Sequence, residues 1–571
     1  MLATLAAYLP AFHAGFIWDD DMYVTANPLL TAPDGLWRIW FSLDSPSQYF
    51  PLTYTVFRLE YGLWGLAPAG YHCVNILLHG VNAVLVWQLL RRLRAPGAWL
   101  AAAIFALHPV QVESVAWITE LKNVMSLFFS LLALLCWQRL VAEESRFAWR
   151  WYLLALAGQA LALASKTTAC TLPAAMLLML WLQHQPIRWP RLAQLVPFVM
   201  LGVGMGLVTM WWERYHQGTQ GTVFALGLPE RMLVASHAFW FYLGKLIIPV
   251  NLMFSYPRWA LTPAEPLAYG WLAACAGLGG LIWYCRRLVG RSVEVALLFH
   301  FLTLSPLLGF IMLYTFWYTF VADHYQYVAC IGPFALAAAG LTVIFAKAGS
   351  RLKWLQPVGC GALLLVLGLL TWRQCGMYAD EDTLWRTTLQ RNPASWMAHE
   401  NLGECLARQG RTDEAIAEWQ AALKYNPDDA FAYYDIGVAR AHAGRIVEAV
   451  ASYRKALELE PDLVKACDHL AWILATGPIP EIRNGPEAVA WAERANLLTH
   501  GADPNLLGTL GAAYAYAGRF PEAVSVIQRA LELAPAQANP ALANSLQVQL
   551  KFYRDNSSFR DLSLTNTLPA Q

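Results

Sequence analysis

The stretch NLGECLARQGRTDEAIAEWQAALKYNP (401–427) returns 34 residues later as DIGVARAHAGRIVEAVASYRKALELEP (435–461). Both copies carry small residues at matching places and end at a proline: Gly403, Ala415, Ala422 and Pro427, then Gly437, Ala449, Ala456 and Pro461. Small residues let the two helices of a hairpin approach closely, and the proline ends the second helix. The repeat therefore predicts stacked helical hairpins.

The pattern continues beyond this pair. It returns as Gly511, Ala523, Ala530 and Pro535, and a degenerate unit with Ala471, Ala488 and Ala495 is stretched by the insertion Thr476–Gly485. With a half-unit at 382–393, the array covers 382–536, and 537–571 is predicted to be a capping helix and tail. The pattern resembles the tetratricopeptide repeat, which implies an α-solenoid that binds peptides or proteins. A spacer or assembly module is the alternative role.

The chain before the array has a different composition. Residues 1–372 contain 37 charged residues and a net charge of +7, whereas the 199 residues after them contain 42 and a net charge of −6. Soluble proteins carry about 25% charged residues. This composition excludes a soluble globular enzyme, a disordered chain and a disulfide scaffold. The ten cysteines are scattered singly, and no basic stripe indicates nucleic-acid binding.

The first part contains apolar segments long enough to cross a membrane as helices. Eleven candidates lie at 1–17, 72–90, 97–112, 121–140, 150–165, 169–184, 193–212, 267–285, 293–315, 322–346 and 354–372. A cleaved signal peptide is the alternative for the first. We expect a multispanning domain over 1–372.

Loop charges predict its orientation. Basic residues follow every second span, at Arg91/Arg92/Arg94, Arg139/Arg146/Arg150, Arg188/Arg191, Arg286/Arg287/Arg291 and Lys347/Arg351/Lys353. All five groups face the cytoplasm, as the positive-inside rule requires, if the apolar stretch 231–249 does not cross. The loops 18–71 and 213–266 and the repeats are then external.

Polar residues gather near the predicted external face. Asp19, Asp20 and Asp21 follow the first span, His72, Asn75 and His79 share a face of the second, and Lys166 lies between the fifth and sixth. Glu113, Glu120 and Lys122 surround the turn into the fourth span, and Asp323 and His324 open the tenth. Buried polar pairs in a helix bundle are the alternative for each group. The sequence has no HExxH motif, cysteine cluster or glycine-rich phosphate loop, so we expect no metal-ligand set and no cofactor, and a requirement for a divalent metal stays open.

Five strings carry a resemblance to a known family: FIWDDDMYVTANPLL (16–30), FPLTYTVFRLEYGLWGLAPAGYHCVNILLH (50–79), ALHPVQVESVAWITELKNVMS (106–126), SKTTACTLP (165–173) and ADHYQYVACIG (322–332). They resemble membrane glycosyltransferases of the C superfold, in the branch that joins a multispanning domain to tetratricopeptide repeats. Its eukaryotic members are O-mannosyltransferases. The resemblance implies an all-α fold, a polyprenyl-phosphate sugar donor and, for a bacterial-type member, the inner membrane with external repeats.

The resemblance also implies roles for residues. It places a catalytic carboxylate at Asp19 or Asp20 and cationic groups at the donor phosphate, here Lys122, Lys166 and His324. His72, Glu113 and Glu120 are further candidates for substrate binding. Some relatives have arginine where Leu121 and His324 stand, and a neutral histidine is a poorer phosphate ligand than arginine.

The expected activity is transfer of a sugar, mannose by resemblance, to Ser or Thr of an exported protein that the repeats recruit. Two alternatives stay open: the same chemistry directed to a lipid or cell-envelope glycan, and a non-catalytic membrane-anchored scaffold. Convergence of Asp19 or Asp20 with Glu113 and Lys122 would favour an enzyme.

Overall fold

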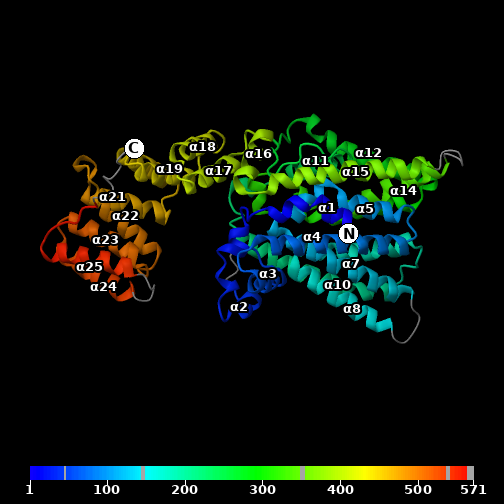
Figure 1. Ribbon diagram of the computed structural model, residues 1–571, viewed down its shortest axis with the longest axis horizontal. Coiled ribbons are helices and arrows are strands. Elements are labelled where there is room, and N and C mark those ends of the chain that lie inside the picture. Colours follow the sequence, from blue (N-terminus) through cyan, green and yellow to red (C-terminus); the bar gives the residue numbers. More distant parts are fainter. Residues whose placement is uncertain (44–46, 143–147, 348–353, 535–539, 562–571) are drawn as a thin grey trace. The chain divides into compact units, whose positions relative to one another are not determined.

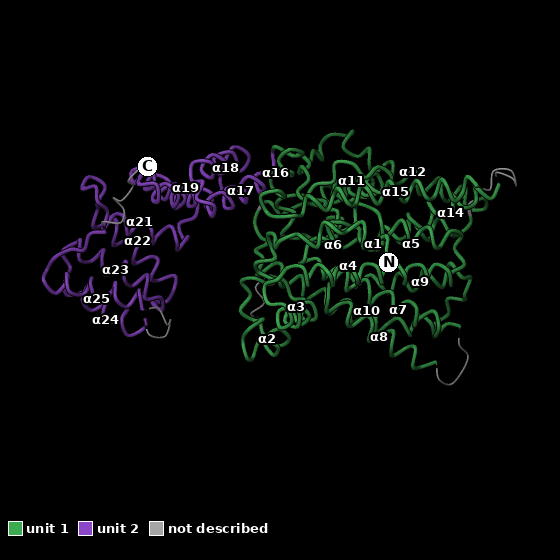
Figure 2. The backbone as a smooth tube through the Cα atoms, in the orientation of Figure 1, with its two compact units in different colours: residues 1–393 green, residues 394–571 purple. Residues whose placement is uncertain are grey.

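The computed structural model describes residues 1–43, 47–142, 148–347, 354–534 and 540–561. These residues form helices and connecting segments, with no strand among them, which confirms the all-α class (Figure 1). The chain divides into two compact units, residues 1–393 and 394–571 (Figure 2). Arg146, Arg351, Lys353, Pro535 and the last ten residues of the predicted tail lie outside the described residues.

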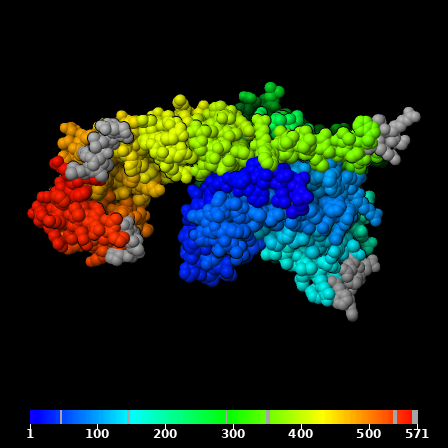
Figure 3. Space-filling view, in the orientation of Figure 1, coloured from blue at the N-terminus to red at the C-terminus, as the bar shows by residue number. Residues whose placement is uncertain are grey.

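Unit 1 is a bundle of long apolar helices joined by short helical turns. The long helices are α4 (Pro68–Arg92), α7 (Leu121–Ala142), α8 (Ala148–Ser165), α10 (Trp189–Tyr215), α11 (Leu228–Ile247), α12 (Gly270–Val289), α14 (Ile331–Lys347) and α15 (Leu355–Cys375). Shorter ones are α1 (Leu2–Ala7), α2 (Gly35–Phe41), α3 (Pro51–Trp64), α5 (Ala98–Leu107), α6 (Val112–Ala116), α9 (Leu172–Leu182), α13 (Arg291–Leu304) and α16 (Glu381–Arg391). On the face that Figure 3 shows, the N-terminal residues lie against α15.

Five described helical stretches are long and apolar enough to cross a membrane: 68–92, 118–142, 189–215, 266–288 and 355–378. A sixth candidate, 98–107 with 109–116, is bent by 52° at His108–Pro109. The predicted count of eleven spans is not confirmed. The predicted first span forms two short helices, α1 and the 3₁₀ turn η1 (Leu9–His13), and α13 ends at Leu304, before Pro306. Proline cannot donate to a helix ladder, so apolar length alone overestimates continuous helix at both places.

The basic residues of the predicted cytoplasmic loops gather at helix ends. Arg91 and Arg92 end α4, Arg139 lies in the last turn of α7, and Lys347 ends α14. Cations at helix C-termini complement the helix dipole. Figure 1 shows the ends of α7 and α14 at one end of unit 1, and α2, α3 and α16 at the opposite end.

Unit 2 consists of helical hairpins. They are α17 (Trp396–Arg408) with α18 (Thr412–Tyr425), α19 (Ala430–His442) with α20 (Ile446–Leu459), α21 (Val464–Thr476) with α22 (Gly485–Leu498), and α23 (Pro504–Tyr516) with α24 (Phe520–Leu533). A Cβ added at Gly403 would lie 2.5 Å from the Trp419 ring, and one at Gly437 would lie 2.6 Å from the Tyr453 ring. The small residues of the repeat therefore admit an aromatic side chain from the second helix of the same hairpin. The last helix, α25 (Pro540–Arg554), packs on α24.

Helix α16 packs within unit 1, although the sequence pattern assigns its residues to the array. The backbone N–H of Trp18 donates to Glu381 Oε1 at 3.0 Å, and Asn392 Nδ2 donates to the Ser255 carbonyl at 3.1 Å. The buried ring of Trp385 meets Trp18 and Phe254 edge to face, at 6.1 and 5.4 Å between centroids. Unit 1 therefore runs to Pro393, and its last helix supports the segment that carries Asp19.

Candidate active site

The segment Ile17–Asp20 turns two carboxylates into the interior of unit 1. Trp18 has a positive φ of 44°, an uncommon conformation for a residue with a side chain, and its ring lies among Trp117, Phe254 and Trp385. Strained backbone of this kind persists where its surroundings fix it, often at functional sites. After this turn, Asp19 is 5% exposed and Asp20 is fully buried.

The two carboxylates have different surroundings. Asp20 accepts hydrogen bonds from the Ile17 N–H at 2.9 Å and from the N–H and hydroxyl of Thr119 at 2.8 and 2.5 Å. Asp19 accepts a bond from the Tyr314 hydroxyl at 3.4 Å. Asp20 therefore joins two segments of the chain, while Asp19 keeps acceptor capacity. Asp21 is exposed and bonds Thr25 of its own turn.

Burial is the main influence on the acidity of both groups. It raises the pKa of Asp19 to about 6, although the nearby Lys122 ammonium opposes the shift. It raises the pKa of Asp20 to about 7 against the hydrogen bonds from Thr119 and Ile17. With a pKa of about 6, Asp19 is mostly ionised at neutral pH and is a stronger base than an exposed aspartate.

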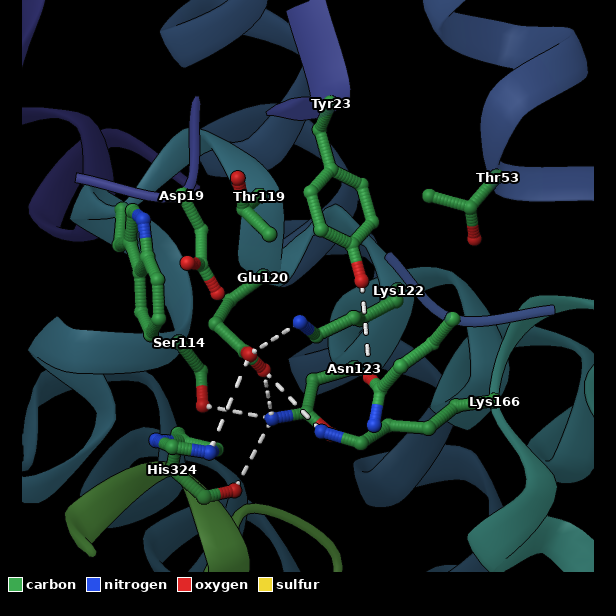
Figure 4. A network of polar contacts seen from close by, with 12 residues as sticks. Asp19, Tyr23, Thr53, Ser114, Thr119, Glu120, Lys122, Asn123, Lys166 and His324 are labelled. Atoms are coloured by element: carbon green, nitrogen blue, oxygen red, sulfur yellow. Dashed lines mark hydrogen bonds and ion pairs between the residues drawn. The ribbon is translucent and has the colours of Figure 1, made fainter. Parts of the chain in front are cut away.

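Glu120 holds two lysines side by side. Its Oε1 lies 3.0 Å from Lys122 Nζ and its Oε2 lies 3.2 Å from Lys166 Nζ, and all three side chains are buried (Figure 4). Asn123 Nδ2 also donates to Glu120. We call Glu120, Lys122 and Lys166 the lysine pair site. Two cations against one carboxylate give these three residues a net charge of +1, which the ionised Asp19 nearby offsets. The positive charge is in excess once Asp19 takes up a proton, and it then favours an anionic ligand.

Each member of the lysine pair site is fixed by the local fold. Glu120 ends the turn η5 (Ile118–Glu120), and Lys122 lies in the first turn of α7. The Lys122 ammonium lies over the rings of Tyr23 and Trp117, at 4.9 and 5.5 Å from their centroids. The carbonyl before Lys166 accepts a bond from the Thr53 hydroxyl at 3.0 Å. Figure 4 shows the Asp19 carboxylate beside Glu120.

Glu113 and His324 form a second pair next to this site. Glu113 Oε1 lies 2.8 Å from His324 Nδ1, and Glu113 Oε2 accepts from the His324 backbone N–H at 3.2 Å. His324 Nε2 lies 3.9 Å from Glu120 Oε1, and the His324 carbonyl accepts from Asn123 at 2.9 Å. Glu113 therefore orients the imidazole towards Glu120.

The structure brings together all but one of the predicted site residues, namely Asp19, Asp20, Glu113, Glu120, Lys122, Lys166 and His324. His72 is buried beside the backbone of Ala14 and Gly15, and no described contact joins it to the lysine pair site. The other members of its helix face are structural. His79 lies 2.8 Å from the Tyr327 hydroxyl, and Asn75 bonds the carbonyls of Trp117 and Ile118.

Tyr314 and Glu213 also belong to the site, although no sequence motif indicates them. Buried Glu213, at the end of α10, accepts from the Tyr314 backbone N–H at 3.0 Å and from Gln48 Nε2 at 2.8 Å. Tyr314 in turn donates to Asp19 through its hydroxyl. Glu213 therefore positions the residue that contacts Asp19. The available signal was an acid directly after the apolar run that ends in Trp211–Trp212.

We expect Glu213→Gln to lower turnover by about tenfold, because its amide nitrogen cannot accept a hydrogen bond and leaves one buried donor unpaired. Initial rates at saturating donor measure the effect. Glu230→Gln, on the first turn of α11, is the matched control and should be silent. Unchanged turnover in Glu213→Gln would show that Glu213 does not position Asp19 through Tyr314.

A cavity of about 200 Å³ extends from this network between α7, α9, α13 and α14. Asn123, Ser126 and Tyr325 line one part of it, and Arg94 and Ser292 line another. The walls between them are mainly leucine, alanine and valine side chains. The cavity therefore offers an apolar space that begins beside the lysine pair site.

Comparisons with known proteins agree with this layout. Residues 51–212 match the family "dolichyl-phosphate-mannose-protein mannosyltransferase", and residues 383–420, 408–463 and 506–541 match tetratricopeptide repeats. The protein O-mannosyl-transferase F38B6.6 of Caenorhabditis elegans is 25% identical over 438 residues, which are 72% of this chain and 60% of that protein.

Other relatives match over a shorter region. Protein O-mannosyl-transferase TMTC2 of Mus musculus is 34% identical over 26% of this chain, and Tmtc1 of Drosophila melanogaster is 34% identical over 29%. The matched residues are 19% and 20% of those two proteins. The apolar helices and the family match together indicate a membrane protein. In this chain, a region that matches the mannosyltransferase family model precedes tetratricopeptide repeats, and the relatives compared are named protein O-mannosyl-transferases.

Proposed function

We propose that the chain is a membrane O-mannosyltransferase that moves mannose from a polyprenyl-phosphate carrier to a Ser or Thr hydroxyl of a protein at the external membrane face. The observation that carries the proposal is the juxtaposition of Asp19, a buried carboxylate with spare acceptor capacity, and the lysine pair site with its excess cation. A scaffold would need neither. The names of the relatives support mannose and a protein acceptor.

In this mechanism Asp19 accepts the proton of the acceptor hydroxyl. The hydroxyl oxygen forms a bond to C1 of mannose as the bond from C1 to the phosphate oxygen breaks, through an oxocarbenium-like state. The leaving polyprenyl phosphate gains negative charge, which Lys122 and Lys166 stabilise. The phosphate then needs no proton, so one base is sufficient.

The remaining residues hold these groups in place. Asp20 ties the segment that carries Asp19 to Thr119, the residue before Glu120. Glu120 holds the two ammonium groups close to each other. The apolar cavity that starts at Asn123 and Tyr325 would take the first part of the polyprenyl tail. This arrangement supports a lipid-linked donor over a water-soluble nucleotide sugar.

The direct test uses purified full-length chain in lipid nanodiscs, radiolabelled polyprenyl-phosphate mannose and a Ser/Thr-containing acceptor protein. We expect the label to appear in the acceptor protein. Base-catalysed β-elimination should release it, as it does a sugar linked to Ser or Thr. Label in lipid or glycan instead would favour the envelope-glycan alternative. No transfer to any acceptor from a chain that binds the donor would contradict the proposal.

The pH dependence of kcat/KM should be bell-shaped. Asp19 must be ionised, so the rate should rise with pH through about 6, its raised pKa. Burial lowers the pKa of Lys166 to about 8 although Glu120 opposes the shift, so phosphate binding should weaken as pH rises above that value. Lys166→Arg keeps its charge at high pH and should move the alkaline limb upward while leaving the acid limb in place. An unmoved alkaline limb would exclude Lys166 as its origin.

A further inference from the structure

The first helices of the hairpins in unit 2 present carboxylates and aromatic rings on a common face. Three positions before the small residue of the four repeats stand Glu400, Tyr434, Asp468 and Gly508, and two positions before it stand Asn401, Asp435, His469 and Thr509. Helices α21 and α23 contact each other directly, and the Thr509 side chain bonds Asp468 across that contact. We call this surface the inner face.

A cavity of about 510 Å³ opens on the inner face between α19, α21, α23 and α25. Its walls include the rings of Tyr453, His469 and Trp472 and the amides of Asn505 and Gln549. The Tyr453 hydroxyl lies 3.2 Å from His469 Nδ1, and Trp472 Nε1 donates to Asp561 at 2.9 Å. The aromatic walls are therefore held in place before any ligand binds.

Asp468 supplies the charge of this cavity. The Thr509 side chain bonds its carboxyl group, while its Oδ1 is buried and has no hydrogen-bond partner among the described residues. Burial raises the pKa of Asp468 to about 6. A buried carboxylate oxygen without a hydrogen-bond donor costs free energy, which a ligand that supplies a donor would recover. Aromatic rings around a carboxylate suit the stem and the charged head of a lysine or arginine.

More carboxylates continue along the inner face. Burial, together with the nearby charges of Glu404 and Asp429, raises the pKa of Asp435 to about 7. The Lys465 ammonium opposes this shift. Asp429, Glu404 and Asp435 likewise raise the pKa of Glu400 after burial. Carboxylates that repel one another are stabilised when cations bind among them.

We propose that the inner face binds an extended cationic polypeptide segment, with one Lys or Arg side chain in the Asp468 cavity and a second beside Asp435. Helices α19 and α21, which carry Asp435 and Asp468, line the same cavity. For helices packed roughly 8–10 Å apart and an extended chain that rises roughly 3.3 Å per residue, we expect the two basic residues about three positions apart. Binding of a cationic segment does not depend on the proposed function. The assignment of this segment to the acceptor protein does rest on it.

The test is equilibrium binding of a fluorescent, Ser/Thr-containing peptide with lysines at i and i+3 to the full chain in nanodiscs, without donor. Asp468→Asn should weaken binding at least tenfold. This factor is the lower end of what a hydrogen bond to a charged group contributes to affinity. Glu458→Gln removes the same charge from α20, where Glu458 pairs with Lys455 in an exposed position, and should leave binding unchanged. Binding should also fall as salt rises.

A second measurement needs no variant. The unaltered chain should bind the lysine peptide at least tenfold more tightly than the same peptide with glutamine at both positions. Equal binding of the two peptides, or equal binding of the lysine peptide to Asp468→Asn, would overturn the proposal. Asp19→Asn should bind the peptide normally, so loss of transfer with intact binding tests the catalytic proposal separately.

Discussion

Asp19→Asn should lower the rate of mannose transfer by about 10²–10⁴-fold, the usual contribution of a positioned general base. The substitution keeps the size of the side chain and can still accept the bond from Tyr314, but it removes the basic carboxylate. Donor binding and thermal stability should stay close to those of the parent. Single-turnover rates with bound donor measure the chemical step directly.

Two neighbouring substitutions are the controls. Asp21→Asn changes an exposed acid that bonds Thr25 and should be nearly silent. Asp20→Asn should destabilise the fold by about 1–3 kcal/mol, because an amide cannot accept from both Ile17 and Thr119 without leaving a buried donor unpaired. Full turnover on the native acceptor after neutralising Asp19 and Asp20 together would show that the mechanism is wrong.

The sequence was sufficient to predict where the acids and lysines gather. Asp19 and Asp20 follow the first apolar segment, and Glu120 and Lys122 stand at the start of another, so a helical bundle brings them to one end. It could not separate the roles of Asp19 and Asp20. Their difference depends on Thr119 and Tyr314, which are 99 and 295 residues away along the chain and carry no local signal.

Other predictions depended on patterns that tertiary packing overrides. Apolar length predicted a span over 293–315, but the helix ends at Leu304 and the next segment contributes Tyr314 to the site. The repeat pattern reaches residue 382 and the tetratricopeptide family matches from residue 383, while Glu381 and Trp385 of the same helix also pack on Trp18. His72 shares a helix face with Asn75 and His79, but that face holds helices together. Periodicity identifies a face and does not identify what covers it.

Lys122→Met should weaken donor binding by about 10- to 150-fold, and Lys166→Met should do the same if both ammonium groups contact the phosphate. A hydrogen bond between charged groups contributes about 1.5–3 kcal/mol, which corresponds to that range. Methionine preserves the apolar stem and removes the charge. Isothermal titration of the chain with polyprenyl-phosphate mannose measures the change. Lys347→Met, on the exposed end of α14, is the matched control and should be silent.

The charge balance of the lysine pair site distinguishes lost binding from lost folding. Removing one lysine leaves Glu120 paired with the other lysine and with Asn123, and changes the net charge from +1 to 0, so stability should hold. Glu120→Gln instead leaves two buried ammonium groups together and should destabilise the chain by about 3–5 kcal/mol. Lys→Arg should bind the donor better than Lys→Met at a position that contacts the phosphate. If neither methionine variant changes donor affinity, the phosphate is held elsewhere, and His324, fixed by Glu113 at 2.8 Å, becomes the next residue to test.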